Sequence, residues 1–293
     1  MIERLAARIW SDVAARMAYQ LILRRPIDPG ALEAWRRQLR DKPSCLVKLV
    51  NALILSEEYR LLARSEADAV VLHYLHHERC RLVRNLPAAD VIVDLGGVDP
   101  NDSRGCLLGM GYPHRFTRMT IIDVPPNQSF EQRRATGTFN DVDTAQGKVQ
   151  YVYAPMQDFA RANIPSETVD LIWMGQSIEH ISEPDLDALL PQIYRALRAG
   201  GWFCFDTPNR RITRMQVPNG YIHPDHKVEY EAPALREKMM RAGFEVMRIA
   251  GLGLARVAAG GGEFSSAELI DNMPLNDDPE HSYILYFELR RPH

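Results

Sequence analysis

After Asn85-Leu-Pro87, the sequence alternates short apolar runs, rich in β-branched and aromatic residues, with stretches of helical spacing. This alternation is typical of a parallel β-sheet that is covered by helices on both faces. We therefore predict an α/β fold with a doubly wound sheet. The predicted strands are seven, at residues 91–95, 119–124, 149–153, 169–174, 202–205, 244–249 and 283–289. Helices are predicted over residues 185–199 and 232–242, and a loop-rich insertion over residues 258–279.

The first 85 residues have a different pattern, with apolar positions at i, i+3, i+4 spacing and no strand signal. Pro26-Ile-Asp-Pro-Gly30 and Asp41-Lys-Pro43 interrupt this spacing, so we predict a run of short helices. The sequence thus predicts an N-terminal all-α domain over residues 1–85 and an α/β domain over residues 86–293.

The composition is that of an ordinary globular protein, with 293 residues, 46% of them hydrophobic and 25% charged. A net charge of -3 argues against a polyanion-binding protein, so we expect no nucleic-acid partner. The four cysteines have no C-x-x-C spacing, which argues against a disulfide framework and a thiolate metal cluster. We find no apolar run of the ~20 residues that a membrane span needs and no signal peptide. We therefore expect a cytoplasmic protein without a transmembrane segment.

The strongest local pattern is Val91-Ile-Val-Asp94-Leu-Gly96-Gly97, a predicted buried strand that delivers an acid and then two glycines. Glycines at such a point let the chain turn sharply and let a ligand approach the backbone. The segment resembles motif I of class I S-adenosylmethionine-dependent methyltransferases. This resemblance implies a Rossmann-like catalytic domain, and it assigns Asp94, Gly96 and Gly97 to the cofactor S-adenosylmethionine.

The residues after Gly97 depart from the usual G-x-G spacing of that motif, since the chain continues Val98-Asp-Pro-Asn-Asp-Ser. A nicotinamide or flavin dinucleotide requires three spaced glycines to cradle its pyrophosphate, and the third is missing here. An acidic loop with Asp99 and Asp102 would also repel a pyrophosphate, whereas S-adenosylmethionine is a sulfonium cation without phosphate. The departure therefore favours S-adenosylmethionine over a dinucleotide.

Acidic side chains also follow the second and third predicted strands. Asp123, followed by Val124, ends the second strand, where a carboxylate can accept hydrogen bonds from both ribose hydroxyls; a capping or turn aspartate is the alternative. Gln157-Asp158-Phe159 resembles the family position at which an acid meets the adenine amino group beside an apolar residue. The resemblance thus adds these five residues to the cofactor site, and a solvated turn is the alternative for Asp158.

The segment Gly175-Gln-Ser-Ile-Glu179-His180-Ile181 follows the fourth predicted strand and resembles the same segment of the ubiquinone-biosynthesis-like methyltransferase group. Leu197-Arg-Ala-Gly200-Gly201-Trp202-Phe203 and Thr207-Pro208-Asn209 resemble the parts that come next in that group. The resemblance therefore covers most of residues 91–245, and it implies that Gly175 and Gln176 also contact the cofactor.

Three histidines are candidates for a catalytic base. Methyl transfer from a sulfonium is an in-line displacement, so the protein mainly aligns the nucleophile and, for a hydroxyl acceptor, removes a proton. His180, His223 and His226 lie on predicted loops at the carboxyl edge of the sheet, where ligands bind in open α/β folds. We prefer His226 as the base, with His180 and His223 as the other candidates; a turn-capping role is the alternative for His223.

A metal site is the further hypothesis that Glu179 and His180 raise. Some ubiquinone-pathway O-methyltransferases and small-RNA 2′-O-methyltransferases hold a divalent metal with E-x-x-E-H at this position. Here the first acid is replaced by Gln176, whose neutral amide oxygen is a weaker ligand for a hard cation. We therefore expect no divalent metal and name Glu179 and His180 as its ligands if one binds.

The N-terminal residues 19–35 and 53–59 resemble a small helical module that often accompanies bacterial glycan-modifying enzymes. Together the two resemblances imply an S-adenosylmethionine-dependent O-methyltransferase that acts on a hydroxyl of a sugar, glycan or glycolipid. The alternatives are a quinol, fatty acid or other small metabolite as the acceptor, or a Rossmann-like subunit that binds or scaffolds without catalysis. The sequence leaves the oligomeric state open.

Overall fold

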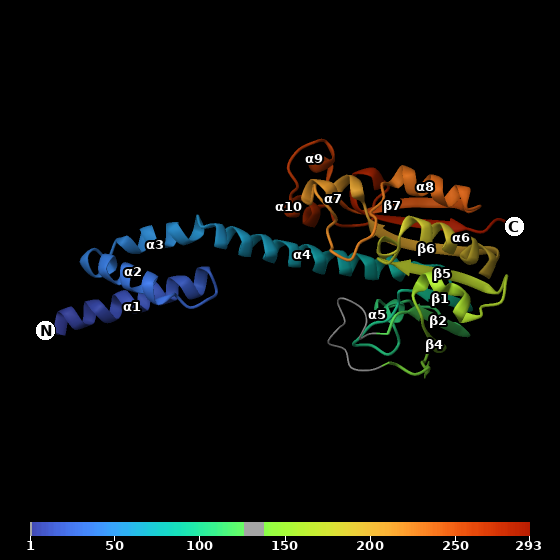
Figure 1. Cartoon of the computed structure of the whole chain (residues 1–293), viewed down its shortest axis with the longest axis horizontal. Helices are drawn as coiled ribbons and strands as arrows, with labels where there is room; N and C mark the ends of the chain where they lie inside the picture. Colours follow the sequence, from blue (N-terminus) through green and yellow to red (C-terminus); the bar gives the residue numbers. More distant parts are fainter. Residues whose placement is uncertain (1, 126–137) are drawn as a thin grey trace. The chain divides into compact units, whose positions relative to one another are not determined.

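The computed structural model describes the backbone of residues 2–125 and 138–293. The chain divides into two compact units, which meet between Leu72 and His73 (Figure 1). This division lies inside helix α4 (Glu57–Val83), earlier in the sequence than the domain boundary expected at residue 86.

The N-terminal unit is helical, as the periodicity predicts. It contains α1 (Ile2–Ile22), α2 (Pro29–Asp41), α3 (Cys45–Ile54) and the first part of α4. Asp28 starts α2 because its side chain accepts a hydrogen bond from the Ala31 amide at 2.8 Å, and Pro29 suits the first turn. Leu39 and Leu49 are fully buried in the core between the first three helices. The expectation of short helices is wrong for α1 and α4, which are 21 and 27 residues long.

The larger unit is built on one eight-stranded sheet with the strand order β3-β4-β2-β1-β5-β6-β8-β7 (Figure 1). Its strands are β1 (Val91–Leu95), β2 (Arg118–Asp123), β3 (Val142–Asp143), β4 (Lys148–Tyr153), β5 (Val169–Gly175), β6 (Leu197–Pro208), β7 (Glu245–Leu254) and β8 (Ser282–Arg290). The predicted α/β fold class and all seven predicted strands are confirmed. The count of seven is wrong by one, because β3 has only two residues and leaves no periodic signal.

Strand direction explains where a ligand site can form. The strand β1 pairs in parallel with β2 on one side and with β5 on the other, so the chain reverses its direction of travel across the sheet at this point. A crevice opens at such a switch point beyond the carboxyl ends of the strands. The strand β8 runs antiparallel to both β6 and β7 and lies between them, so β7 forms this edge of the sheet.

The helices of this unit are mostly short. They are α5 (Cys106–Gly109), α6 (Glu183–Ala196), α7 (Arg210–Gln216), α8 (Ala232–Arg241), α9 (Arg256–Ala259) and α10 (Ser266–Asp271), with the 3-10 turns η1 (Met156–Ala162), η2 (Ile178–His180) and η3 (Pro279–His281). The predicted helices at 185–199 and 232–242 correspond to α6 and α8, although α6 ends sooner because Leu197 is already extended. The insertion expected to be irregular holds α9 and α10, which have four and six residues.

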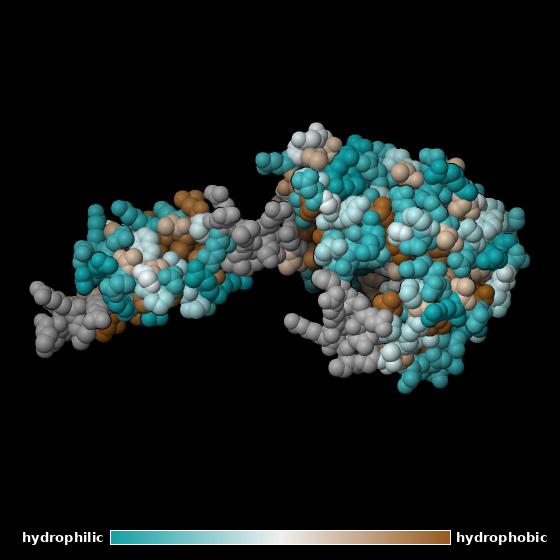
Figure 2. All heavy atoms as spheres, in the orientation of Figure 1, coloured by the Kyte–Doolittle hydropathy of each residue, from teal (hydrophilic) through white to brown (hydrophobic). Residues whose placement is uncertain are grey.

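The core of the larger unit lies between the sheet and helices α6 and α8. Phe203, Phe205 and Phe287 are fully buried there against Leu189 and Leu235. Burying each such side chain stabilises the fold by about 1.5–3 kcal/mol, so this layer holds the strand ends in place. The visible face of the unit is mainly hydrophilic (Figure 2). Among the described residues, no helix combines the length and the apolar character that crossing a membrane requires.

Candidate functional site

A cavity of about 460 Å³ opens at the switch point of the sheet. It is lined by Gly96, Asp123, Val124, Pro155, Met156, Gln157, Gln176, Ser177, His180, Ile181, His223, Asp225 and Lys227. These residues come from the ends of β1, β2, β4 and β5 and from the loop after α7. Seven of the residues predicted from sequence are in this lining, namely Gly96, Asp123, Val124, Gln157, Gln176, His180 and His223.

Both glycines after β1 are required by close packing. Gly96 has a φ of 76°, and a Cβ atom there would lie 2.3 Å from Oγ of Ser177. A Cβ atom on Gly97 would lie 2.1 Å from Oδ2 of Asp94. The two glycines thus let Ser177 and Asp94 pack against the turn, and Gly96 also lines the cavity, where its bare backbone allows close approach by a ligand.

The departure from the usual glycine spacing has a structural explanation. The loop after Gly97 contains two turns in which an aspartate accepts from a backbone amide two residues on, with Asp99 bonded to Asn101 at 2.8 Å and Asp102 to Arg104 at 2.9 Å. The loop closes at Gly105, which has a φ of 84°. The later glycine of the motif is thus displaced along the chain, and these side-chain turns fill the interval.

Asp94 is buried beneath the glycine turn. Neither of its carboxylate oxygens makes a well-formed hydrogen bond among the described residues. Burial raises the pKa of Asp94 to about 7, and the nearby Leu107 amide offsets this shift only in part. A buried carboxylate with so little hydrogen bonding, next to a glycine turn, suits a ligand that brings a hydrogen-bond donor or a positive charge.

Asp123 sits at the end of β2 with its carboxylate held by two backbone amides. Its Oδ2 accepts from the Val98 amide at 3.1 Å, and its Oδ1 accepts from the Val124 amide at 2.7 Å. Burial raises the pKa of Asp123 to about 6. Each oxygen has a further lone pair, so the fixed carboxylate can accept from two hydroxyls in the cavity.

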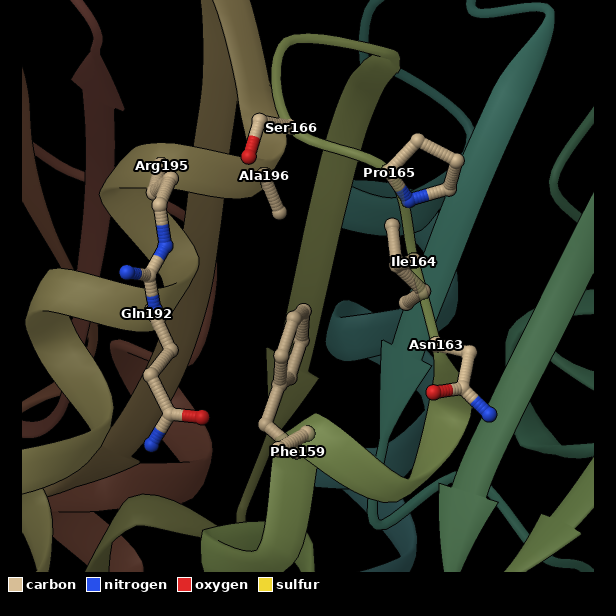
Figure 3. A pocket seen from close by; sticks show the side chains of 9 residues that line it. Phe159, Asn163, Ile164, Pro165, Ser166, Gln192, Arg195 and Ala196 are labelled. Carbon is tan, nitrogen blue, oxygen red and sulfur yellow. The ribbon is translucent and has the colours of Figure 1, made fainter.

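The three residues expected at the adenine end are separated by the structure. Gln157 lines the cavity, whereas the Asp158 side chain is 51% exposed and lies 3.6 Å from Arg161. Phe159 is buried and lines a different cavity, of about 410 Å³. Figure 3 shows its ring between the loop of Ile164 and Pro165 and helix α6.

The segment after β5 is tied to β6 and to α4. Gln176 has a φ of 51°, its backbone amide donates to the Asp206 carbonyl at 2.9 Å, and its Nε2 donates to Oδ2 of Asp206 at 2.9 Å. The guanidinium of Arg79 donates to both carboxylate oxygens of Asp206, at 2.5 and 3.2 Å. The sequence analysis missed Arg79 and Asp206, because nothing in the local pattern of either residue indicates the other.

The three candidate histidines are brought together. The ring centroids of His180 and His226 are 4.9 Å apart, those of His223 and His226 are 5.4 Å apart, and those of His180 and His223 are 6.0 Å apart. His180 and His223 are part of the cavity lining. His226 is not, and its side chain is only 6% exposed. Imidazoles from two separate loops therefore form one cluster at the cavity wall.

Glu229 supports this cluster and was also missed from the sequence. Its Oε1 lies 2.7 Å from Nδ1 of His226 and accepts from the Ile222 amide at 2.9 Å, while Oε2 accepts from the Thr213 hydroxyl. Burial alone would raise the pKa of Glu229, but these hydrogen bonds outweigh it and hold the pKa below its usual value. The i, i+3 spacing of His226 and Glu229 is the sequence feature that could have indicated this pair.

Glu179 is buried beside the histidines. Its Oε2 accepts from the Thr207 hydroxyl at 2.9 Å, and burial raises its pKa to about 8. One ligand atom each of Glu179, His180 and His226 lie within 4.8 Å of one another. Two imidazoles and one carboxylate are a donor set that suits zinc or a first-row transition metal, so these three residues fit a divalent ion.

A family model described as a methyltransferase domain matches residues 71–249. A probable S-adenosylmethionine-dependent methyltransferase of Mycolicibacterium smegmatis is 31% identical over 145 residues, which are 47% of this chain and 55% of the relative. A trans-aconitate 2-methyltransferase of an Azoarcus species is 28% identical over 162 residues, which are 53% of this chain and 52% of the relative. The chain thus spans about half the length of these curated relatives.

Solved structures share the fold. A methyltransferase of Thermotoga maritima, described as a possible histamine N-methyltransferase, superposes with a TM-score of 0.50 at 16% identity and covers 79% of this chain and 96% of its own. A Haloferax volcanii protein, named as a methyltransferase and solved with a methyltransferase activator, gives 0.51 at 16% identity with the same coverage. At this level of identity the likeness concerns the fold alone.

Proposed function

The chain belongs to the methyltransferase-domain family, whose cofactor is S-adenosylmethionine, and from this premise we propose that it transfers a methyl group to a hydroxyl of a sugar, glycan or glycolipid. The observation that carries the proposal is the composition of the cavity. Its wall combines Gly96, Asp123 and Gln157, which the family resemblance assigns to the cofactor, with His180 and His223, which are candidate acid-base groups.

The cofactor supplies a methyl group that is already activated on a sulfonium centre. In our proposal the bare turn at Gly96 lies beneath the cofactor, Asp123 accepts the ribose hydroxyls, and Gln157 borders the adenine. The fixed orientation of the Asp123 carboxylate supports this assignment, because two backbone amides hold it in place before any ligand arrives. The carboxylate of Asp94, which is buried behind the same turn, suits the positively charged end of the cofactor.

His226 is the proposed base or acceptor-orienting residue. An ionised Glu229 only accepts hydrogen bonds, so the imidazole proton of His226 lies on Nδ1 and Nε2 is left as an acceptor. Sugar hydroxyls are poor acids, and a positioned base that removes their proton helps the oxygen to attack the methyl group. His180 and His223 line the cavity, and both pack against the ring of His226.

The chemical class of the methyl acceptor is inferred from the polar residues of the cavity wall and from the N-terminal module. One loop gives the cavity wall three polar side chains, those of His223, Asp225 and Lys227, and polar groups of both signs suit a hydroxyl-rich molecule. The N-terminal helical module, which resembles modules of glycan-modifying enzymes, supports the same class. A quinol, a fatty acid or another small metabolite is the competing acceptor, and one relative is named for methylation of the carboxylic acid trans-aconitate.

A methyl-acceptor screen tests the proposal. Purified protein is given cofactor with a labelled methyl group and panels of sugars, glycolipids, quinols and carboxylic acids, and transfer of label is counted. We expect label on the hydroxyl-rich panel. Transfer only to carboxylic acids would contradict the proposal, because a carboxylate is already ionised and needs no base; His226→Ala would then leave turnover intact. Cofactor binding without transfer of label to any compound would contradict the proposal and favour the alternative, a subunit that binds or scaffolds without catalysis.

A further inference from the structure

Arg79, Asp206 and Gln176 form a chain of hydrogen-bonded side chains that ends at the cavity wall. The guanidinium of Arg79 and the carboxylate of Asp206 meet through two hydrogen bonds, and the Asp206 side chain is fully buried. Such two-point pairs fix both position and orientation of the carboxylate. Asp206 therefore offers a rigid acceptor to Gln176, which lines the cavity.

Gln176 is held by Asp206 at two points, through its backbone amide and through Nε2. Its φ of 51° lies in the left-handed region, which a residue other than glycine adopts only when its surroundings require it. With Nε2 turned to Asp206, the carbonyl oxygen Oε1 is turned away from Asp206. The amide is thus held in one orientation, with its acceptor available to a ligand in the cavity.

This arrangement also explains why residue 176 is a glutamine. A glutamate would place a second carboxylate about as close to Oδ2 of Asp206 as the present 2.9 Å contact. Two carboxylates at such a distance repel strongly in a buried site, and the single guanidinium of Arg79 is already paired with Asp206. The charge of Asp206 therefore demands a hydrogen-bond donor at position 176.

We infer that Arg79 and Asp206 are positioning residues, which turn Gln176 so that its Oε1 accepts a hydrogen bond from the ammonium group at the methionine end of the cofactor. The inference rests on the proposed function, in that the cofactor occupies this cavity. The surroundings agree with it, because Gln176 shares the cavity wall with Gly96, and the carboxylate of Asp94 is buried directly behind this glycine turn. An amide oxygen in the cavity with a carboxylate behind the wall suits a cation.

Calorimetry with two ligands tests the inference. The first ligand is S-adenosylhomocysteine, which carries the ammonium group, and the second is 5′-methylthioadenosine, which lacks the amino-acid portion. For Arg79→Lys and Gln176→Glu we expect affinity for S-adenosylhomocysteine to fall about tenfold, the size of one hydrogen bond to a charged group, with affinity for 5′-methylthioadenosine unchanged. A merely structural role would lower both affinities together and would overturn the inference, as would unchanged affinity for S-adenosylhomocysteine.

A charge swap supplies the second arm. The double variant Gln176→Glu with Asp206→Asn again has one carboxylate and one amide in contact, with their positions exchanged. We expect it to bind S-adenosylhomocysteine more tightly than Gln176→Glu alone, and failure of this rescue in a variant that unfolds at the wild-type temperature would overturn the inference. Absence of S-adenosylhomocysteine binding by the wild-type protein would instead overturn the proposed function. The two failures are therefore distinguishable.

Discussion

Nδ1 of His226 lies 2.7 Å from Oε1 of Glu229, and this contact fixes which nitrogen of the imidazole carries the proton. The remaining hydrogen bonds of Glu229, from Thr213 and from the Ile222 amide, hold the carboxylate in place. The pair thus has the arrangement of an oriented base, in which a buried acid sets the ring and the far nitrogen is available to accept a proton.

The first prediction concerns His226. Loss of a positioned base typically costs ~10²–10⁴-fold in rate, so His226→Ala should lower turnover by that order while cofactor affinity stays near the wild-type value. Glu229→Gln should lower turnover in the same direction, because a neutral amide no longer fixes the tautomer. Turnover, S-adenosylhomocysteine affinity and thermal unfolding measured on each variant check this.

His281 provides a matched control for that experiment. Its Nδ1 lies 2.8 Å from Oδ1 of Asp278, three residues away as in the pair of His226 and Glu229, but His281 is on η3 and outside the cavity lining. His281→Ala should leave turnover unchanged. Near-normal turnover of His226→Ala would remove this residue from the mechanism and direct the same measurements to His180 and His223.

The second prediction concerns the ribose end of the cofactor site. Asp123→Ala should weaken cofactor binding by ~1–3 kcal/mol, the order expected when hydrogen bonds to a charged group are lost. Asp170 is the control, because it accepts from the Val91 amide at 2.8 Å and pairs with Arg198, but does not line the cavity. Calorimetry is done on Asp123→Ala and on the control variant Asp170→Ala. Equal affinities of wild type and Asp123→Ala would show that Asp123 is not the ribose ligand.

The third prediction concerns pH. Burial raises the pKa of Asp94 to about 7 and that of Asp123 to about 6 in the cofactor-free protein. Because the ionised carboxylates bind the cofactor, its affinity should increase as pH rises from 5 to 8. The folded protein holds these protons to higher pH than the unfolded chain does, so the contribution of these two acids to the stability of the cofactor-free protein should decrease from about pH 4, near the unfolded aspartate pKa, to about pH 7.

Titration calorimetry and denaturant unfolding across this pH range measure both effects. Asp94→Asn is the informative variant, since it keeps the size of the side chain and removes its charge. It should be more stable than the wild type at pH 8 and should bind the cofactor more weakly. A wild-type affinity that is flat from pH 5 to 8 would contradict the proposed contacts of both acids.

The fourth prediction concerns metal. Gln176 offers only a neutral amide oxygen where metal-dependent relatives have an acid, and one oxygen of Glu179 accepts from Thr207, so a hard cation such as magnesium finds few charged ligands here. We expect turnover to survive dialysis against a chelator. Complete loss that a divalent ion restores would show that Glu179, His180 and His226, which lie close enough to share an ion, hold a metal during the reaction.

Local sequence patterns determined most elements of this protein and the position of the glycine turn after β1. The seven longer strands have short runs rich in β-branched, aromatic and other apolar residues, and Gly96 and Gly97 follow β1 where side chains of Ser177 and Asp94 leave no room for a Cβ atom. Such features depend on neighbouring residues or on a single sterically restricted position, so they can be read along the chain. The two-residue strand β3 has too little sequence to carry such a pattern.

Only the tertiary structure decided which polar side chains meet. His180 and His226 are far apart in sequence yet pack ring to ring, whereas Asp158 and Phe159, which adjoin Gln157, point elsewhere. Arg79 reaches Asp206 from a helix that precedes the whole sheet. Side-chain direction depends on helix phase and strand register, which packing of the complete core sets, and the sequence around each residue carries no record of its distant partner.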